Sequence, residues 1–171
     1  ARRVAHALGL PHLTFDATDV FREEVVDYFV QQYAQGATPN PCAKCNARVR
    51  FSLLLSLAER LGLVGIATGH YARMEGDPPT LSRAVDHLKD QSYLLAEVSP
   101  QYLRRCRFPL GTLCKPEVRA LVADAGVGGH EVPDSQEICF VEDDDHRRFL
   151  RSRLGERPGT IVDGEGRRLR A

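Results

Sequence analysis

Hydrophobic residues recur along the chain at two different spacings, and this change of spacing predicts alternating helices and strands. Apolar residues three or four positions apart predict helices over residues 1–9, 19–30, 47–61, 116–126 and 146–154. Short apolar runs predict strands over residues 12–16, 64–68, 80–84, 137–141 and 158–162. Strands that alternate with helices of this length indicate an α/β fold, with a parallel sheet covered by helices on both faces.

The length of 171 residues and the apolar content of 43% suit one full domain and the start of another. We expect the first domain to cover residues 1–143 and the second to begin at residues 144–171. The opening helix lacks a preceding strand and the closing hairpin lacks its returning strand, so we expect both ends to be truncated.

Charge and hydropathy narrow the possible partners. Lys and Arg together number 23, as do Asp and Glu, so any contact with RNA has to come from a local patch. Apolar runs such as Leu53–Leu55 are far too short to span a bilayer, and no signal peptide is recognisable. We therefore expect a cytoplasmic protein without a membrane partner.

Two cysteines at the start of a helix are the first candidates for chemistry. Pro39 and Pro41 exclude a helix before Cys42. Cys42 and Cys45 then open the amphipathic helix, where exposed amides and neighbouring Lys and Arg side chains should lower a thiol pKa. The pattern predicts a reactive sulfur at a place that attracts anions.

The spacing of Cys42 and Cys45 leaves several alternatives open, because it also suits zinc, an iron–sulfur cluster or redox chemistry. Cys139 and His70 are the obvious additional ligands. Five cysteines without a secretory signal favour a reducing compartment. The two remaining cysteines, Cys106 and Cys114, lie in apolar surroundings, and we expect them to be packing residues.

Polar residues follow the predicted strand 64–68, at the position where parallel sheets bind ligands. Gly69 would let a ligand approach the backbone closely. His70 suits either a ligand pocket or packing. The cluster Lys89, Asp90 and Gln91 is typical of a solvated turn, unless nucleic acid is present.

Five segments, in order, resemble one known family. They are TPNP and CN within residues 38–46, IATGHYAR at 66–73, KDQSY at 89–93, FPLG and KPEVR within 108–119, and DSQ and ICF within 134–140. Together these segments resemble the bacterial tRNA-specific 2-thiouridylases, which install sulfur at C2 of the wobble uridine.

The resemblance implies a Rossmann-like, adenine-nucleotide-hydrolase (PP-loop) domain, a small tRNA-binding linker domain and a C-terminal β-barrel. It implies a sulfurtransferase that uses ATP with Mg²⁺ to adenylate the uridine oxygen of tRNA. A cysteine persulfide then supplies sulfur, and a second cysteine releases the sulfur through a disulfide. By motif, Cys139 would carry the persulfide and Cys45 would be the partner nucleophile.

The resemblance also assigns contacts. Asn40, Pro41 and Cys42 would lie against the target base, Gly69 would touch ATP, and the segment Lys89, Asp90 and Gln91 would touch tRNA. A persulfide-donating sulfur carrier or a cysteine desulfurase relay would be a further partner.

Two departures from the family pattern limit these expectations. The Gly-rich phosphate loop belongs upstream of Ala1 and the barrel downstream of Ala171, so we expect this chain alone to be inactive. Many members carry an acid at the position of Cys42. The alternative of a non-catalytic tRNA-binding module, with a metal or cluster on Cys42, Cys45 and Cys139, therefore stays open. Asp134 and Glu137 precede Cys139, so we expect that thiol to ionise less readily than Cys45.

Overall fold

The computed structural model describes residues 1–127, 138–156 and 158–169. In chain order, with η marking 3₁₀ and π turns, its elements are α1 (Arg2–Ala7), α2 (Thr18–Phe21), η1 (Arg22–Asp27), α3 (Tyr28–Ala34), α4 (Pro41–Cys45), η2 (Asn46–Arg50), α5 (Phe51–Arg60), β1 (Ile66–Ala67), β2 (Ala72–Glu75), β3 (Thr80–Arg83), η3 (Ser92–Leu95), α6 (Pro100–Leu103), β4 (Cys106–Arg107), η4 (Pro109–Thr112), α7 (Lys115–Asp124), η5 (Glu142–Asp144) and α8 (His146–Leu154).

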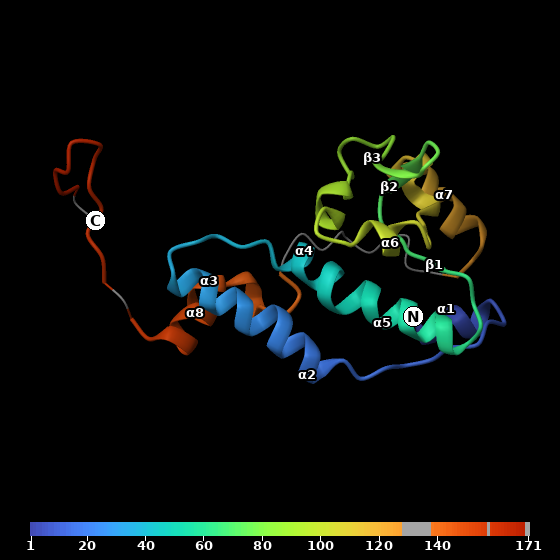
Figure 1. The fold of residues 1–171 in the computed structure, drawn as a ribbon, viewed down its shortest axis with the longest axis horizontal. Coiled ribbons are helices and arrows are strands. Elements are labelled where there is room, and N and C mark those ends of the chain that lie inside the picture. Colours follow the sequence, from blue (N-terminus) through green and yellow to red (C-terminus); the bar gives the residue numbers. More distant parts are fainter. Residues whose placement is uncertain (128–137, 157, 170–171) are drawn as a thin grey trace.

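Two long helical runs dominate the structure (Figure 1), the first formed by α2, η1 and α3 and the second by α4, η2 and α5. The predicted helices are confirmed, and α8 has the predicted bounds. The second run begins earlier than expected, because Pro41 is its first helical residue. Proline fits that position, where its fixed φ suits the helix and its missing N–H is not needed.

Two short sheets accompany these helices. β1 and β4 are parallel, with Ile66 opposite Cys106, and β2 and β3 form an antiparallel hairpin with Ala72 opposite Arg83. The expected strands at 64–68 and 80–84 are therefore confirmed in shortened form. The sequence patterns do not predict β2, which directly precedes a turn that begins at Gly76.

Three predicted strands are wrong in the described residues. Residues 12–16 form no strand, and Leu13 and Phe15 are 61% and 56% exposed. Residues 138–141 form a turn, while residue 137 lies outside the described residues. In the segment 158–162, Val162 makes a single bridge to Arg168. A strand needs the backbone of a neighbour, and none of these segments lies in a ladder within the described chain.

The hydrophobic core lies between α5 and the elements that follow it. Phe51, Leu95 and Cys106 are fully buried there, and they pack with residues from β2, α6 and the segment after β4. Cys106 is the packing cysteine that the sequence predicted, and its thiol donates a hydrogen bond to the carbonyl of Tyr102 (3.0 Å). Cys114 is half-buried and caps α7.

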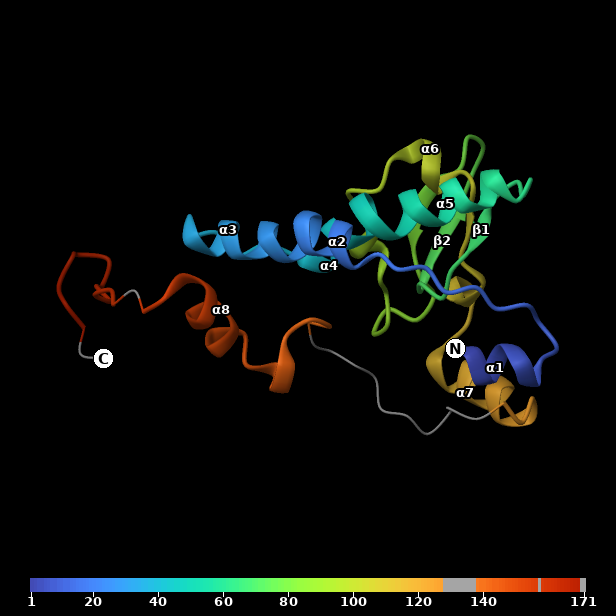
Figure 2. The ribbon, with the colours of Figure 1, turned by 90° about the horizontal axis from the view of Figure 1, so that it is seen from below.

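A second, aromatic cluster joins α3 to α8, which lie alongside each other in Figures 1 and 2. The ring of Phe29 lies 5.4 Å from that of Phe140 and 6.2 Å from that of Phe149. Phe29 is 1% exposed. Because Phe140 directly follows Cys139, this cluster fixes the position of that cysteine. Within the described chain, no helix has the length and hydropathy needed to cross a membrane.

Candidate active site

The two helix-start cysteines owe their position to Asn40, the N-cap residue of α4. Its side-chain oxygen accepts hydrogen bonds from the amides of Cys42 and Ala43, each at 3.1 Å. These are two of the amide groups that a helix start leaves without partners. Three residues apart, Cys42 and Cys45 lie on consecutive turns, and both side chains are half-buried.

The expected low pKa of Cys45 is wrong. Burial raises the pKa of the Cys45 thiol, and the positive charge of Arg50 offsets only part of this effect. Burial also raises the pKa of Cys42. The expectation considered the helix end and the neighbouring charges, but not the desolvation of a thiol inside the fold, which disfavours the thiolate.

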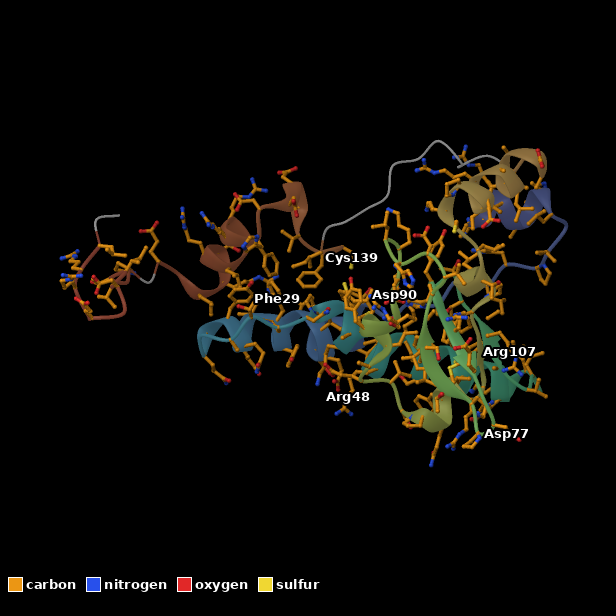
Figure 3. All side chains as sticks on the ribbon, turned by 90° about the horizontal axis from the view of Figure 1, so that it is seen from above. Phe29, Arg48, Asp77, Asp90, Arg107 and Cys139 are labelled. Carbon is orange, nitrogen blue, oxygen red and sulfur yellow. The ribbon has the colours of Figure 1, made fainter. Side chains whose placement is uncertain are left out.

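Cys139 lies close to both of these cysteines, although about 95 residues separate it from them along the chain. The negative charge of its thiolate raises the pKa of Cys42 and of Cys45. Figure 3 shows Cys139 beside the start of the helix that carries Cys42 and Cys45 (the cysteine helix, which begins with α4), with Asp90 nearby. Cys139 is exposed in a turn. The acidic residues expected to suppress its ionisation, 134 and 137, lie outside the described residues.

A cavity of about 730 Å³ opens beside these cysteines and brings together most of the predicted contact residues. It is lined by Pro39, Asn40, Pro41, Cys42, Tyr71, Leu88, Lys89, Asp90, Gln91, Tyr93, Leu94, Lys115 and Ile138. The residues predicted to meet the target base therefore share one cavity with the Lys-Asp-Gln segment. Ile138 brings the residue before Cys139 to the same wall.

Within the Lys-Asp-Gln segment, the side chains of Asp90 and Gln91 accept hydrogen bonds from the protein itself. The carboxylate of Asp90 accepts hydrogen bonds from the amide of Ala84 (2.8 Å) and the hydroxyl of Ser92 (2.8 Å). Burial alone would raise the pKa of Asp90, but these hydrogen bonds and the charge of Arg83 hold it below its ordinary value. The side-chain oxygen of Gln91 accepts a hydrogen bond from the backbone amide of Tyr71 (3.1 Å).

Gly69 and His70 follow β1 as expected, but neither lines this cavity. Gly69 is exposed. His70 is 6% exposed, packs against the ring of Phe51 and lies 2.8 Å from the hydroxyl of Thr68 through Nδ1. Burial, together with the charge of Arg50, lowers the pKa of His70 to about 4. Of its two interpretations, the structure favours a neutral packing histidine.

The metal alternatives gain no support from the geometry. Among the described residues, which include Cys42, Cys45 and Cys139, no group of three or more His, Cys, Asp or Glu side chains is arranged to hold a metal ion. The three cysteines are neighbours without forming a ligand set.

Residues 1–143 match the tRNA methyl transferase HUP domain family. The tRNA-specific 2-thiouridylase MnmA of Mycolicibacterium smegmatis is 48% identical over 166 residues, covering 97% of this chain and 46% of that protein. The MnmA of Acidothermus cellulolyticus is 48% identical over 171 residues, covering 99% and 47%. The chain belongs to the tRNA 2-thiouridylase family.

Membership in the 2-thiouridylase family confirms the fold class, because the HUP domain is an α/β domain with a parallel sheet of the PP-loop, Rossmann-like kind. The MnmA of Heliobacterium modesticaldum, 46% identical over 97% of this chain, supports the same conclusion. The chain spans about half the length of the curated relatives that it matches.

One residue that the sequence patterns missed links the site together. Asn46, next to Cys45, is 3% exposed, and its side-chain amide donates a hydrogen bond to the carbonyl of Leu94 (3.1 Å). This bond ties the cysteine helix to the cavity wall that follows Gln91. An asparagine inside an apolar helix was the available signal, because asparagine favours caps and turns over helix interiors.

Proposed function

We propose that the complete protein is an ATP-dependent tRNA-uridine 2-sulfurtransferase that acts in the cytoplasm. The observation that carries this proposal is the cavity that Cys42 shares with Lys89 and with Ile138, the neighbour of Cys139. Its volume of about 730 Å³ is in the range of cavities that hold small-molecule groups the size of a nucleoside. The curated relatives carry the name tRNA-specific 2-thiouridylase, which fits a pair of cysteines better than the family's methyl transferase title.

In this proposal the wobble uridine lies against Asn40, Pro41 and Cys42, while Lys89 offers a positive charge to the tRNA backbone. Pro41 is buried and Asn40 is held by its capping bonds, so this wall of the cavity is rigid before RNA arrives. Rigid walls hold a reacting base in one orientation, which lowers the entropic cost of reaction.

Bound ATP, with Mg²⁺ on its phosphates, would supply the adenylyl group that turns the uridine carbonyl oxygen into a leaving group. Gly69 fits contact with the nucleotide, because it is exposed after β1 and a Cβ there would meet Leu110 Cδ1 only at 3.8 Å. The open backbone at the end of a parallel strand is where nucleotides bind in such sheets.

Sulfur transfer then uses the persulfide of Cys139, which a sulfur carrier or cysteine desulfurase relay would load. An exposed cysteine suits loading by another protein. Cys45 is the partner nucleophile. Burial raises its pKa and the charge of Arg50 lowers it. Thiol–disulfide exchange between them frees the sulfur on the uridine.

The experiment measures 2-thiouridine by nucleoside mass spectrometry after the complete protein acts on unmodified tRNA with ATP and a persulfide donor. We expect product with the wild type and with Cys114→Ser, whose serine preserves the cap of α7, and none with Cys139→Ser. A wild type that forms no 2-thiouridine, or an active Cys139→Ser variant, would overturn the proposal.

We favour the persulfide route over an iron–sulfur cluster, because the described residues do not gather Cys42, Cys45 and Cys139 into a ligand set. Iron and acid-labile sulfide measured in protein purified without oxygen separate the two routes. Activity in iron-free protein supports the persulfide route, whereas activity proportional to cluster content contradicts it.

A further inference from the structure

The cysteine that faces the cavity is Cys42, the residue that lies one helical turn before the predicted partner nucleophile. Cys42 lines the cavity together with Ile138, whereas Cys45 does not contribute to its wall. A sulfur intermediate held between a base in this cavity and Cys139 would therefore meet the thiol of Cys42 first.

The charge of Cys139 acts on both thiols. For Cys42, the thiolate of Cys139 is the largest charge effect on the pKa and exceeds that of Arg50. For Cys45 the order is reversed, and Arg50 has the larger effect. Because the interaction between two charges weakens with distance and exposure to water, Cys139 is coupled more closely to Cys42 than Arg50 is.

We propose, building on the proposed function, that Cys42 is a further catalytic thiol that resolves the sulfur intermediate on Cys139 and forms a Cys42–Cys139 disulfide. Cys42 and Cys45 lie on consecutive turns of the same helix, α4, so that helix can present either thiol to Cys139. The site therefore holds two alternative resolving thiols.

The step balances without an added oxidant. The terminal sulfur of the Cys139 persulfide attacks C2 of the adenylated uridine, AMP leaves, and the persulfide becomes a disulfide between Cys139 and the uridine. Cys42 loses its proton to water, and its thiolate attacks Sγ of Cys139. The bond between Sγ and the transferred sulfur breaks, and its electron pair stays on the sulfur of 2-thiouridine. The two cysteines are oxidised by two electrons and the transferred sulfur is reduced by two.

The test is a single turnover of the complete protein, persulfidated in advance, with ATP and tRNA, stopped by thiol alkylation. Peptide mapping without reductant then identifies the disulfides, and nucleoside mass spectrometry quantifies 2-thiouridine. We expect a Cys42–Cys139 linkage in the wild type and also in Cys45→Ser. We expect Cys42→Ser to release 2-thiouridine about tenfold more slowly, or about 1.4 kcal/mol in activation free energy.

Cys114→Ser is the matched control, because it replaces a cysteine outside the site and should leave the linkage and the rate unchanged. Circular dichroism and the melting temperature establish that Cys42→Ser is folded, and Cys42→Ala provides a second variant that cannot act as a nucleophile.

The outcomes separate the two proposals. A wild type that forms no 2-thiouridine overturns the proposed function together with this inference. Normal product with only a Cys45–Cys139 linkage, and an unchanged rate in Cys42→Ser, overturns the inference alone. Iron bound stoichiometrically through Cys42 in the active protein would also overturn it.

Discussion

Lys89, Asp90 and Gln91 are consecutive residues whose side chains are a cation, a carboxylate and an amide. All three line the cavity, but the carboxylate of Asp90 and the amide of Gln91 bond to the protein's own backbone and to Ser92. We infer that Asp90 and Gln91 shape the wall and that Lys89 supplies the charge that meets RNA. The resemblance named these residues as one RNA-binding group, and the hydrogen bonds of Asp90 and Gln91 add a structural role for these two.

Replacement of Asp90 should therefore affect stability, whereas replacement of Lys89 should affect tRNA binding. Asp90→Ala should lower the free energy of unfolding by about 2–3 kcal/mol, because the amide of Ala84 would lose its charged acceptor. That acceptor is the carboxylate of Asp90, whose side chain is 8% exposed. Lys89→Ala should instead weaken tRNA binding and make its salt dependence shallower by about one unit. Denaturant unfolding and filter binding at several salt concentrations measure both effects. Unchanged stability in Asp90→Ala would contradict this division.

The buried His70 should make stability depend on pH. Its pKa falls from 6.5 to about 4 on folding, so between these values the unfolded state binds the proton that the folded state refuses. Stability is therefore complete above pH 6.5 and decreases as the pH falls toward 4. Between pH 7 and pH 4.5, roughly 2–3 kcal/mol should be lost in the wild type beyond the loss in His70→Gln.

The matched control for this titration is His146→Gln, since His146 is exposed. Denaturant unfolding at the two pH values should give this variant the same loss of stability as the wild type. If His70→Gln loses as much stability as the wild type, His70 is not the group responsible.

At the scale of elements, η4 packs so closely on β2 that it leaves no room for a side chain. A Cβ on Gly111 would lie 1.8 Å from the carbonyl oxygen of Ala72 and 2.7 Å from its carbon. Backbone atoms of a strand cannot move aside as a flexible side chain can. This contact supports the strand that leads from His70 and Tyr71 into the hairpin.

Gly111→Ala should therefore lower the free energy of unfolding by about 2–3 kcal/mol, because the two elements would have to separate. Gly159→Ala, where a Cβ would have no neighbour within 4 Å, should change it by less than about 0.5 kcal/mol. Denaturant unfolding of both variants measures the difference. Equal stability of the two variants would show that η4 is not held against β2 in this way.

Helices were more predictable than strands for a physical reason. The hydrogen bonds of α8 are local. Its N-cap residue, Asp145, accepts a hydrogen bond from the backbone amide of Arg148 (2.8 Å), so the local sequence specifies where the helix starts. Residues 12–16 have an apolar pattern typical of a strand, yet they are exposed without a ladder. Strand formation depends on a partner that lies elsewhere in the chain, and periodicity does not reveal it.

At the scale of the whole molecule, the site depends on contacts between segments that are far apart in the sequence, and residue spacing does not reveal such contacts. The aromatic contacts of Phe140 with Phe29 and Phe21 hold Cys139 near the start of the cysteine helix. The resemblance identified the two cysteines from their motifs. It did not predict that burial raises the thiol pKa values or that Asn46 bonds to Leu94.

In the proposed reaction, sulfur moves from Cys139 to a tRNA uridine that ATP has activated. The most direct measurement loads the complete protein with one equivalent of ³⁵S persulfide, adds tRNA with or without ATP, and follows the label in a single turnover. We expect the label to leave Cys139 and to appear in 2-thiouridine only when ATP is present. Label that stays on the protein with ATP and tRNA, or that reaches tRNA equally well without ATP, would contradict the claim.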